Sequence, residues 1–351
     1  MKISLWGYYG FNYGDDIMMN LFLKELEEKD VQVILIDSHN GNLKEKVNNT
    51  NVQVIEYWKL TKFNKIKMLF KLARETKLNI WGGGTVFTDV DNDGNFLNFI
   101  LLKLFGGKIG YISVGIGEIK KTSRKIKTKL LIKLSNLISL RDKKSFEYSR
   151  NINPKISHYS EDVTYYYFQN FNTKTDENKD YLLISFRKLS KYYDEARELS
   201  LANQLISIIP DFMNKNNLSK IVLLPLDKQD NDINKYIADS LSNSFETTML
   251  TTTDVDEMTG LIKNSSIYIS GRLHGSVASE FFDISTLTLS YSNKIEFFYS
   301  SINKHFIDLN KEGIDHKKVY QILENNKKAK GFKHSENNAY QNIELIYNYI
   351  K

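Results

Sequence analysis

Short apolar segments alternate with helical patterns along nearly the whole chain, and this alternation constrains the fold most. In the first half we expect strands at 3–7, 31–37, 52–57, 79–82, 108–115 and 137–141, and helices at 15–29, 62–76 and 96–105. Strands that are separated by helices form largely parallel sheets with helices on their faces. The sequence therefore predicts an α/β protein.

The alternation stops near the middle of the chain and then starts again. Residues 170–180 (NFNTKTDENKD) have almost nothing to bury, and further strands follow at 181–187, 220–226, 247–251, 266–270 and 286–290. The 351 residues suit two domains. We predict a domain at 1–170, a linker at 171–180 and a second domain at 181–330. Residues 331–351 should end in a helix that packs back toward the first domain.

Two Rossmann-like domains that face a cleft bind their ligands at the carboxyl ends of the strands. The absence of cysteine excludes thiol nucleophiles, disulfides and Cys-ligated metals. No G-x-S-x-G, Walker A or H-E-x-x-H pattern occurs either, which disfavours nucleophilic hydrolases, NTPases and zinc proteases. The acidic loop 89–94 resembles the start of an EF-hand, but Ile100 stands where the bidentate Glu would be, so no metal is predicted.

A glycine-rich segment, GYYGFNYGDD at 7–16, follows the first strand and opens a helix. Glycine permits close approach of the backbone to a ligand, so Asn12 and Gly14 are candidate binding residues. Asp15 and Asp16 at the helix start would repel a phosphate. Asp15 is either a helix N-cap or a ligand for a sugar hydroxyl, and Asp16 is a candidate general base.

Glycines also follow the predicted strand 79–82. In WGGGT at 81–85, three successive glycines carry a large entropic cost, which suggests close approach by a ligand or by another backbone. Gly83 and Gly84 are therefore candidate binding residues.

The segment SGRLHGS at 270–276 is the strongest candidate site. A guanidinium and an imidazole, Arg272 and His274, stand at the end of a strand where a helix begins. Helix N-terminal amides and Arg bind anions, and His transfers protons at neutral pH. The other candidate binding residues of this segment are Gly271, Leu273, Gly275 and Ser276.

Further polar residues stand at predicted strand ends. Arg187 closes the run LLISF, Arg141 and Asp162 follow strands of the first domain, and Lys294 follows a strand of the second. Each alone fits a surface ion pair as well as a site. Their shared position at strand ends makes them candidates.

The positive charge is concentrated in one segment. Residues 120–133 contain seven Lys or Arg and no acid, whereas the whole chain has 48 basic and 42 acidic residues. The rest of the chain is nearly neutral, so nucleic-acid binding is not indicated. A helix here either rests on an anionic membrane or is a solvated surface helix with its apolar face in the core. No export signal or spanning segment is recognised, and we expect a cytoplasmic protein, either free or peripheral at the inner face of the cell membrane.

The chain resembles the polysaccharide pyruvyl transferase family. The resemblance rests on GYYGFNYGDD, WGGGTVF, SLRDKKS at 139–145, Asp162, ISFR at 184–187, LLPLDKQDND at 223–232 and SGRLHGSVASEFFDISTLTLSYSNKIEFF at 270–298. Val163 stands where the family usually has Pro after this Asp. The resemblance implies a glycosyltransferase-B-like (GT-B) fold.

The implied reaction moves pyruvate from phosphoenolpyruvate onto two hydroxyls of a sugar, giving a cyclic ketal and phosphate. Arg272, Arg187 and Lys294 would bind the two anionic groups of the donor. His274 would transfer protons, and Asp16 or Asp162 would orient or deprotonate a sugar hydroxyl. This chemistry demands no redox cofactor or metal. The acceptor is either a lipid-linked saccharide or a soluble glycan.

Two other functions are consistent with the same residues. A nucleotide-sugar glycosyltransferase of the same fold would bind a uridine or guanosine nucleotide and ignore phosphoenolpyruvate. A sugar-binding scaffold would have no use for a cation and a base held together in Arg-Leu-His.

Overall fold

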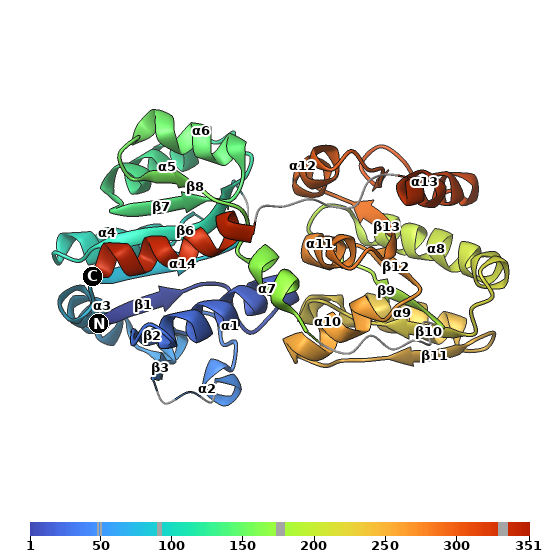
Figure 1. The fold of residues 1–351 in the computed structure, drawn as a ribbon, viewed down its shortest axis with the longest axis horizontal. Helices are drawn as coiled ribbons and strands as arrows, with labels where there is room; N and C mark the ends of the chain where they lie inside the picture. Colours follow the sequence, from blue (N-terminus) through green and yellow to red (C-terminus); the bar gives the residue numbers. More distant parts are fainter. Residues whose placement is uncertain (48, 50, 90–92, 173–179, 329–335) are drawn as a thin grey trace. The chain divides into compact units, whose positions relative to one another are not determined.

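The computed structural model describes residues 1–47, 49, 51–89, 93–172, 180–328 and 336–351 (Figure 1). The chain forms two compact units. The first comprises residues 1–11, 15–170 and 334–351, and the second comprises residues 12–14 and 171–333. The expected linker and the acidic loop 89–94 both fall partly outside the described residues.

The first unit contains a parallel sheet with the strand order β3-β2-β1-β4-β6-β7-β8, and β5 pairs with β6. The strands are β1 (Lys2–Trp6), β2 (Gln32–Ile36), β3 (Val52–Ile55), β4 (Leu78–Gly82), β5 (Thr85–Phe87), β6 (Ile109–Ile116), β7 (Leu137–Leu140) and β8 (Ser157–Tyr159). The helices are α1 (Tyr13–Glu27), α2 (Leu43–Lys46), α3 (Lys62–Glu75), α4 (Phe96–Leu104), α5 (Thr122–Leu134), α6 (Lys143–Ile152), α7 (Thr164–Asn170) and α14 (Glu336–Ile350), with a 3-10 turn η1 (Tyr57–Lys59).

Both faces of this sheet are covered by helices. Side chains alternate along a strand, so Ile3 and Leu5 of β1 enter one core, whereas Trp6 enters the other. The first core includes residues of α1 and α14, and the second includes residues of α3, α4, α5 and α6. The sheet is therefore buried on both faces, as its apolar strands predict.

The last helix, α14, belongs to the first unit. It buries Ile343, Ile346 and Ile350 in the same core as α1. Fully buried Asn342 accepts a hydrogen bond from Ser160 (2.7 Å) and donates one to the carbonyl of Glu161 (2.9 Å). This polar anchor fixes the position of the helix along the sheet, because a displaced Asn342 would be buried without partners.

The second unit has a parallel six-stranded sheet with the order β11-β10-β9-β12-β13-β14. Its strands are β9 (Tyr181–Ser185), β10 (Lys220–Leu223), β11 (Glu246–Met249), β12 (Ile267–Ser270), β13 (Ser285–Ser290) and β14 (Ile307–Asp308). Its helices are α8 (Glu195–Lys215), α9 (Asn231–Leu241), α10 (Val255–Lys263), α11 (Leu273–Phe281), α12 (Asn293–Ser301) and α13 (His316–Lys328), with a 3-10 turn η2 (Lys228–Asp230). The predicted α/β class with parallel sheets is confirmed. Three short strands, β5, β8 and β14, were not expected.

Within the described part of the chain, no helix has both the length and the apolar character needed to cross a bilayer. The predicted basic helix is α5. Leu131 and Ile132 of α5 are buried in the core, and Arg124 and Lys127 lie 3.4 and 2.9 Å from Asp93. Part of its apolar face is thus internal, whereas Ile126 and Leu130 of the same helix are 61% and 39% exposed.

Candidate functional site

In the second unit, three neighbouring strands carry the candidate residues at their carboxyl ends. Arg187 follows β9, Arg272 follows β12 and begins α11, and Lys294 lies in the first turn of α12, after β13. Because β9, β12 and β13 are adjacent and parallel, their ends share one edge of the sheet. The sequence prediction that these residues share one edge is met for this unit.

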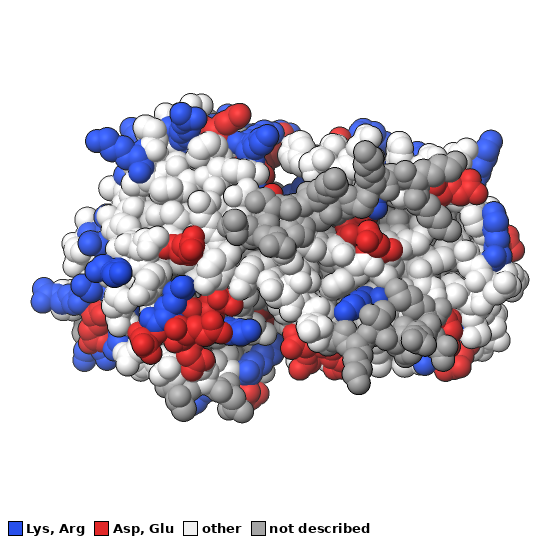
Figure 2. All heavy atoms as spheres, in the orientation of Figure 1, with Lys and Arg blue, Asp and Glu red and all other residues white. Residues whose placement is uncertain are grey.

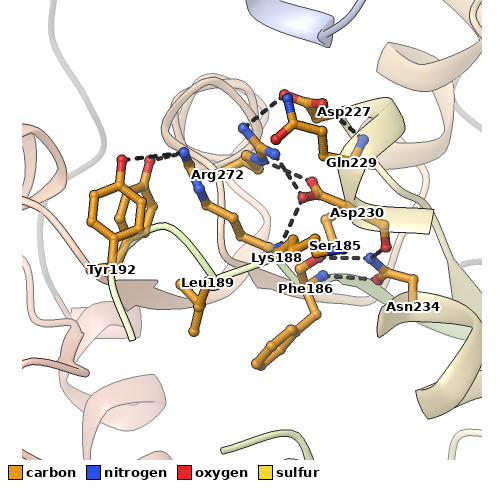
Figure 3. Close-up of polar contacts among 12 residues, drawn as sticks. Ser185, Phe186, Lys188, Leu189, Tyr192, Asp227, Gln229, Asp230, Asn234 and Arg272 are labelled. Atoms are coloured by element: carbon orange, nitrogen blue, oxygen red, sulfur yellow. Dashed lines mark hydrogen bonds and ion pairs between the residues drawn. The ribbon is translucent and has the colours of Figure 1, made fainter. Parts of the chain in front are cut away.

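Arg272 is held by two carboxylates (Figure 3). Its Nε and Nη2 donate to Asp230 at 2.8 and 2.6 Å, and its Nη1 lies 3.1 Å from Asp227. Burial alone would lower the pKa of Arg272, but the charges of Asp230 and then Asp227 raise it above its usual value. The cluster has one more negative than positive charge, so Arg272 is a poorer phosphate ligand than the sequence suggested.

The carboxylates also hold the neighbouring loops. Asp230 is 1% exposed and accepts the backbone N–H of Lys188 (2.9 Å), while Asn234 bonds both the N–H and the C=O of Phe186 (3.0 and 2.6 Å). The loop after β9 is therefore tied to η2 and α9 (Figure 3). Asp227 and Asp230 were not predicted as site residues, although both lie in LLPLDKQDND, after β10.

Arg187 has a different environment, made of aromatic rings. Its guanidinium carbon lies 4.0 Å from the ring centroid of Tyr291 and 5.4 Å from that of Tyr192. Its Nη1 donates a hydrogen bond to the hydroxyl of Tyr291, and its Nη2 donates one to the hydroxyl of Tyr192 at 3.4 Å. Among the described residues it has no carboxylate partner, and its buried Nε–H has no acceptor. Arg187 is thus a cation with an uncompensated charge at the edge of the sheet.

Two helices begin at the same edge as Arg187. The N-cap residues of α11 and α12, Arg272 and Ser292, give no side-chain cap to the first-turn amides. The buried hydroxyl of Ser292 has no partner among the described residues. Open helix N-termini attract anions, because their free N–H groups and dipoles point outward. Lys294 is exposed in the first turn of α12.

Glycines let these pieces approach each other. A Cβ on Gly271 would lie 2.9 Å from the backbone nitrogen of Arg187, and one on Gly275 would overlap the hydroxyl of Tyr268. Gly271 and Gly275 therefore serve close packing at the ends of β9 and β12. Ser276 is fully buried and bonds Thr288 (2.9 Å), so its side chain packs α11 onto β13 and is not available to a substrate. Leu273 is half-buried at the start of α11.

His274 lies in the first turn of α11 and is contacted by the segment 12–14. A Cβ added to Gly14 would overlap the imidazole at Nδ1. Asn12 and Asp227 form an isolated antiparallel β-bridge through their backbones, and the N–H of Tyr13 donates to the carbonyl of Leu226 (2.9 Å). The Tyr13 hydroxyl lies 2.7 Å from that of Thr259. These backbone contacts thus hold the segment 12–14 against His274.

In the first unit, the candidate residues also lie at strand ends. Gly83 and Gly84 follow β4 with φ near +79° and +78°, and a Cβ on Gly84 would lie 3.3 Å from the carboxylate of Asp15. Asp16 accepts the N–H of Gly10 (2.5 Å) and lies 3.7 Å from Lys46. Asp16 therefore holds the glycine-rich loop, and Asp15 is only half-buried.

Arg141 and Asp162 form a buried ion pair in this unit. Nη1 of Arg141 donates to Asp162 at 2.5 Å, and Nη2 donates to Thr85 at 3.2 Å. Burial opposes the charge of Arg141, but Asp162 and then Asp142 raise its pKa above the usual value. Asp162 also accepts the N–H and hydroxyl of Thr164 (3.0 and 2.8 Å). With so many protein partners, Asp162 is less suited to a general base than the sequence suggested.

The described residues contain no group of three or more His, Asp or Glu side chains placed to hold a metal ion. The model of the polysaccharide pyruvyl transferase family matches residues 12–293, which include the loop at His274, Arg187 and both carboxylates at Arg272. The chain belongs to this family. No curated protein sequence matches it.

Solved structures of similar fold share little sequence with this pyruvyl transferase family member. The UDP-GlcNAc 2-epimerase from Methanocaldococcus jannaschii has a TM-score of 0.68 and 10% identity over 99% of this chain and 100% of its own. The enzyme of the same name from Neisseria meningitidis, bound to UDP-GlcNAc, has a TM-score of 0.64 and 11% identity, and the match covers 99% of this chain and 100% of that one. MurG from Acinetobacter baumannii has a TM-score of 0.50 and 11% identity, and the match covers 99% of each chain. The predicted GT-B fold is confirmed.

Proposed function

We propose that this protein transfers pyruvate from phosphoenolpyruvate onto two hydroxyls of a sugar, in a cell-surface polysaccharide or its precursor. The observation that carries the proposal is Arg187. Phosphoenolpyruvate has two anionic groups, and Arg187 is a cation without a carboxylate partner among the described residues. It lies at the same sheet edge as the open N-termini of α11 and α12. Family membership supplies the reaction class.

In this proposal the donor binds the second unit. Arg187 and the amides of α11 bind its phosphate and carboxylate, with Lys294 as a further cation. Ser292 offers a hydroxyl to the same anion. Arg272 does not bind the donor directly: with Asp227 and Asp230 it holds the loops that carry Arg187 and His274 in place.

Protonation of the methylene carbon makes C2 of the donor electrophilic, and the oxygen of one sugar hydroxyl bonds to it. The second hydroxyl oxygen then bonds to C2 while the C–O bond to phosphate breaks. The two hydroxyl protons balance the new methyl hydrogen and the proton on the released phosphate, so no redox change occurs. His274 donates and accepts these protons, because an imidazole can act as either acid or base and Gly14 packs against its ring.

The acceptor binds the first unit in this proposal. Asp15 is half-buried at the start of α1, and a Cβ on Gly84 would lie 3.3 Å from its carboxylate. We therefore assign Asp15 to orient a sugar hydroxyl, with Gly83 and Gly84 leaving room for the ring. The acceptor is either lipid-linked or a soluble glycan.

Calorimetric titration of phosphoenolpyruvate and, in parallel, UDP-GlcNAc tests the proposal. Wild type should bind phosphoenolpyruvate saturably, Arg187→Ala should lose at least about 100-fold in affinity, and Tyr192→Phe should change it little. Binding of the nucleotide sugar alone would instead support a nucleotide-sugar enzyme of the same fold. If phosphoenolpyruvate binds, release of phosphate from it only when a saccharide is added would identify the transfer reaction.

A further inference from the structure

One helical layer of the first unit exposes large apolar side chains. The helices α3, α4 and α5 cover one face of the sheet side by side, since α4 contacts both of the others. The exposed residues are Phe63 (75%), Ile66 (48%) and Phe70 (42%) of α3, Leu97 (68%) and Leu104 (74%) of α4, and Ile126 (61%) and Leu130 (39%) of α5. We call these seven residues and their helices the α3–α5 face.

The exposed residues recur at helical spacing. In α3 the spacing of Phe63, Ile66 and Phe70 places all three on one side of the helix, next to the stripe of its buried residues. Phe70 also packs edge-on against Phe105, just after α4, with ring centroids 5.5 Å apart. The outward apolar side of α3 is therefore continuous with the end of α4.

Helix α4 shows the mismatch most clearly. Its sequence FLNFILLKL is apolar on all sides, a pattern typical of helices that are covered all round. Phe99 and Leu102 are indeed buried, yet Leu97 and Leu104 are more than two-thirds exposed. Large apolar side chains that are exposed on neighbouring helices, rather than scattered singly, point to an interaction site.

Positive charge surrounds this apolar surface. The helices α3, α4 and α5 together carry eleven Lys and Arg and one acid, Glu75, whereas the rest of the chain carries 37 basic and 41 acidic residues. Among the described residues, no ion pair involves the side chains of Lys62, Lys67, Lys125, Lys129 or Lys133. The opposite layer, with α14 and α1, shows red and blue patches close together (Figure 2). The surplus charge of the protein is therefore located on the α3–α5 face.

We propose that the α3–α5 face binds the surface of a bilayer that contains anionic lipids. Apolar side chains on a helical layer can insert among the acyl chains, and flanking lysines attract the headgroups. A second copy of the chain fits less well, because it would bring eleven like charges against eleven. The proposal extends the binding surface from α5 to all three helices, and it does not depend on the proposed reaction.

Flotation of the full-length protein with vesicles tests this. Wild type should float with phosphatidylcholine vesicles that contain phosphatidylglycerol, but not with pure phosphatidylcholine. The bound fraction should fall as salt rises from 50 to 500 mM, because screening shortens the reach of the lysines. The triple variant Phe63→Ser/Leu97→Ser/Leu104→Ser should reduce partitioning at least about tenfold, as should Lys62→Glu/Lys67→Glu/Lys125→Glu/Lys129→Glu.

Matched controls come from the second unit. Tyr236 and Phe297 are also exposed, at 39% and 52%, so Tyr236→Ser/Phe297→Ser should float like wild type. Circular dichroism and thermal unfolding should show that all variants fold. No flotation at low salt, or equal flotation of the apolar triple variant, would overturn the proposal. So would lipid-free dimerisation that the same triple variant abolishes, since the face would then join two copies of the chain.

Discussion

Arg272 and Asp230 are joined by two hydrogen bonds, Nε to Oδ2 at 2.8 Å and Nη2 to Oδ1 at 2.6 Å. A planar guanidinium that meets a carboxylate in this way is fixed in orientation as well as in position. Asp230 also accepts the N–H of Lys188, the residue after Arg187. The pair therefore connects the end of β12 to the loop after β9, which carries Arg187, the residue proposed to bind phosphoenolpyruvate.

Removing Asp230 should destabilise the protein. Asp230→Ala leaves the buried guanidinium with only Asp227, and breaking a buried pair costs about 3 kcal/mol. Urea unfolding would measure this loss. Asp232→Ala is the matched control, because that side chain is 91% exposed and should change stability by less than about 0.5 kcal/mol. Equal stability of the two variants would mean that the pair does not hold the loops together.

Replacing Arg187 by Lys should impair donor binding even though the charge is kept. A lysine ammonium has neither the planar face that stacks on Tyr291 nor the fork that bonds two phenols. We expect KM for phosphoenolpyruvate to rise about tenfold in Arg187→Lys and more in Arg187→Ala, with little change in Tm. Lys188→Ala, on the next residue, should leave KM near its wild-type value. A normal KM in Arg187→Ala would move the donor site elsewhere.

Gly14→Ala should act through His274. Because the added methyl would occupy the position of the imidazole, the ring must turn away, and general acid–base catalysis contributes about 100-fold or more to rate. We expect kcat to fall by roughly that factor, with no further loss in Gly14→Ala/His274→Ala beyond His274→Ala alone. Gly260→Ala, in α10 with nothing within 4 Å of the new methyl, is the control and should keep full activity. Additive losses in the double variant would contradict this explanation.

Glu280 should make stability depend on pH. Burial raises the pKa of this carboxyl, although its bond to Lys304 opposes the shift. A raised folded-state pKa gives stability that is present below the unfolded-state pKa and is lost as pH rises through the folded-state value. The free energy of unfolding of wild type, relative to Glu280→Gln, should therefore fall as pH rises above about 4.5. Urea unfolding at several pH values would show this, and a flat difference would contradict it. Glu246→Gln, with a 70% exposed side chain, serves as the control.

Local sequence patterns were enough to predict the fold class. Most of the longer strands are apolar runs with polar flanks, and Arg187, Arg272 and Lys294 follow predicted strands, so their common edge was predictable. The strands β5, β8 and β14 have only two or three residues, which is too short for a periodic pattern. Their existence depends on neighbours that already form the sheet.

The partners of the charged residues were not predictable from local patterns. Asp230 lies 42 residues before Arg272, and nothing near SGRLHGS indicates that its arginine is neutralised. Gly14 and His274 are still further apart in the sequence. Strand-end position predicts which residues share an edge, whereas ion pairs and close glycine contacts depend on how loops from different strands pack.

The return of α14 to the first unit has a consequence for fragments of the chain. The carboxyl-terminal helix is covalently attached to the second unit, yet its core and hydrogen-bond partners belong to the first (Figure 1). A single backbone cut between α7 and β9 would leave the amino-terminal piece holding α14 as a docked peptide that carries the second unit with it. The two pieces should therefore co-purify after such a cut, whereas a second cut between α13 and α14 would remove this tether.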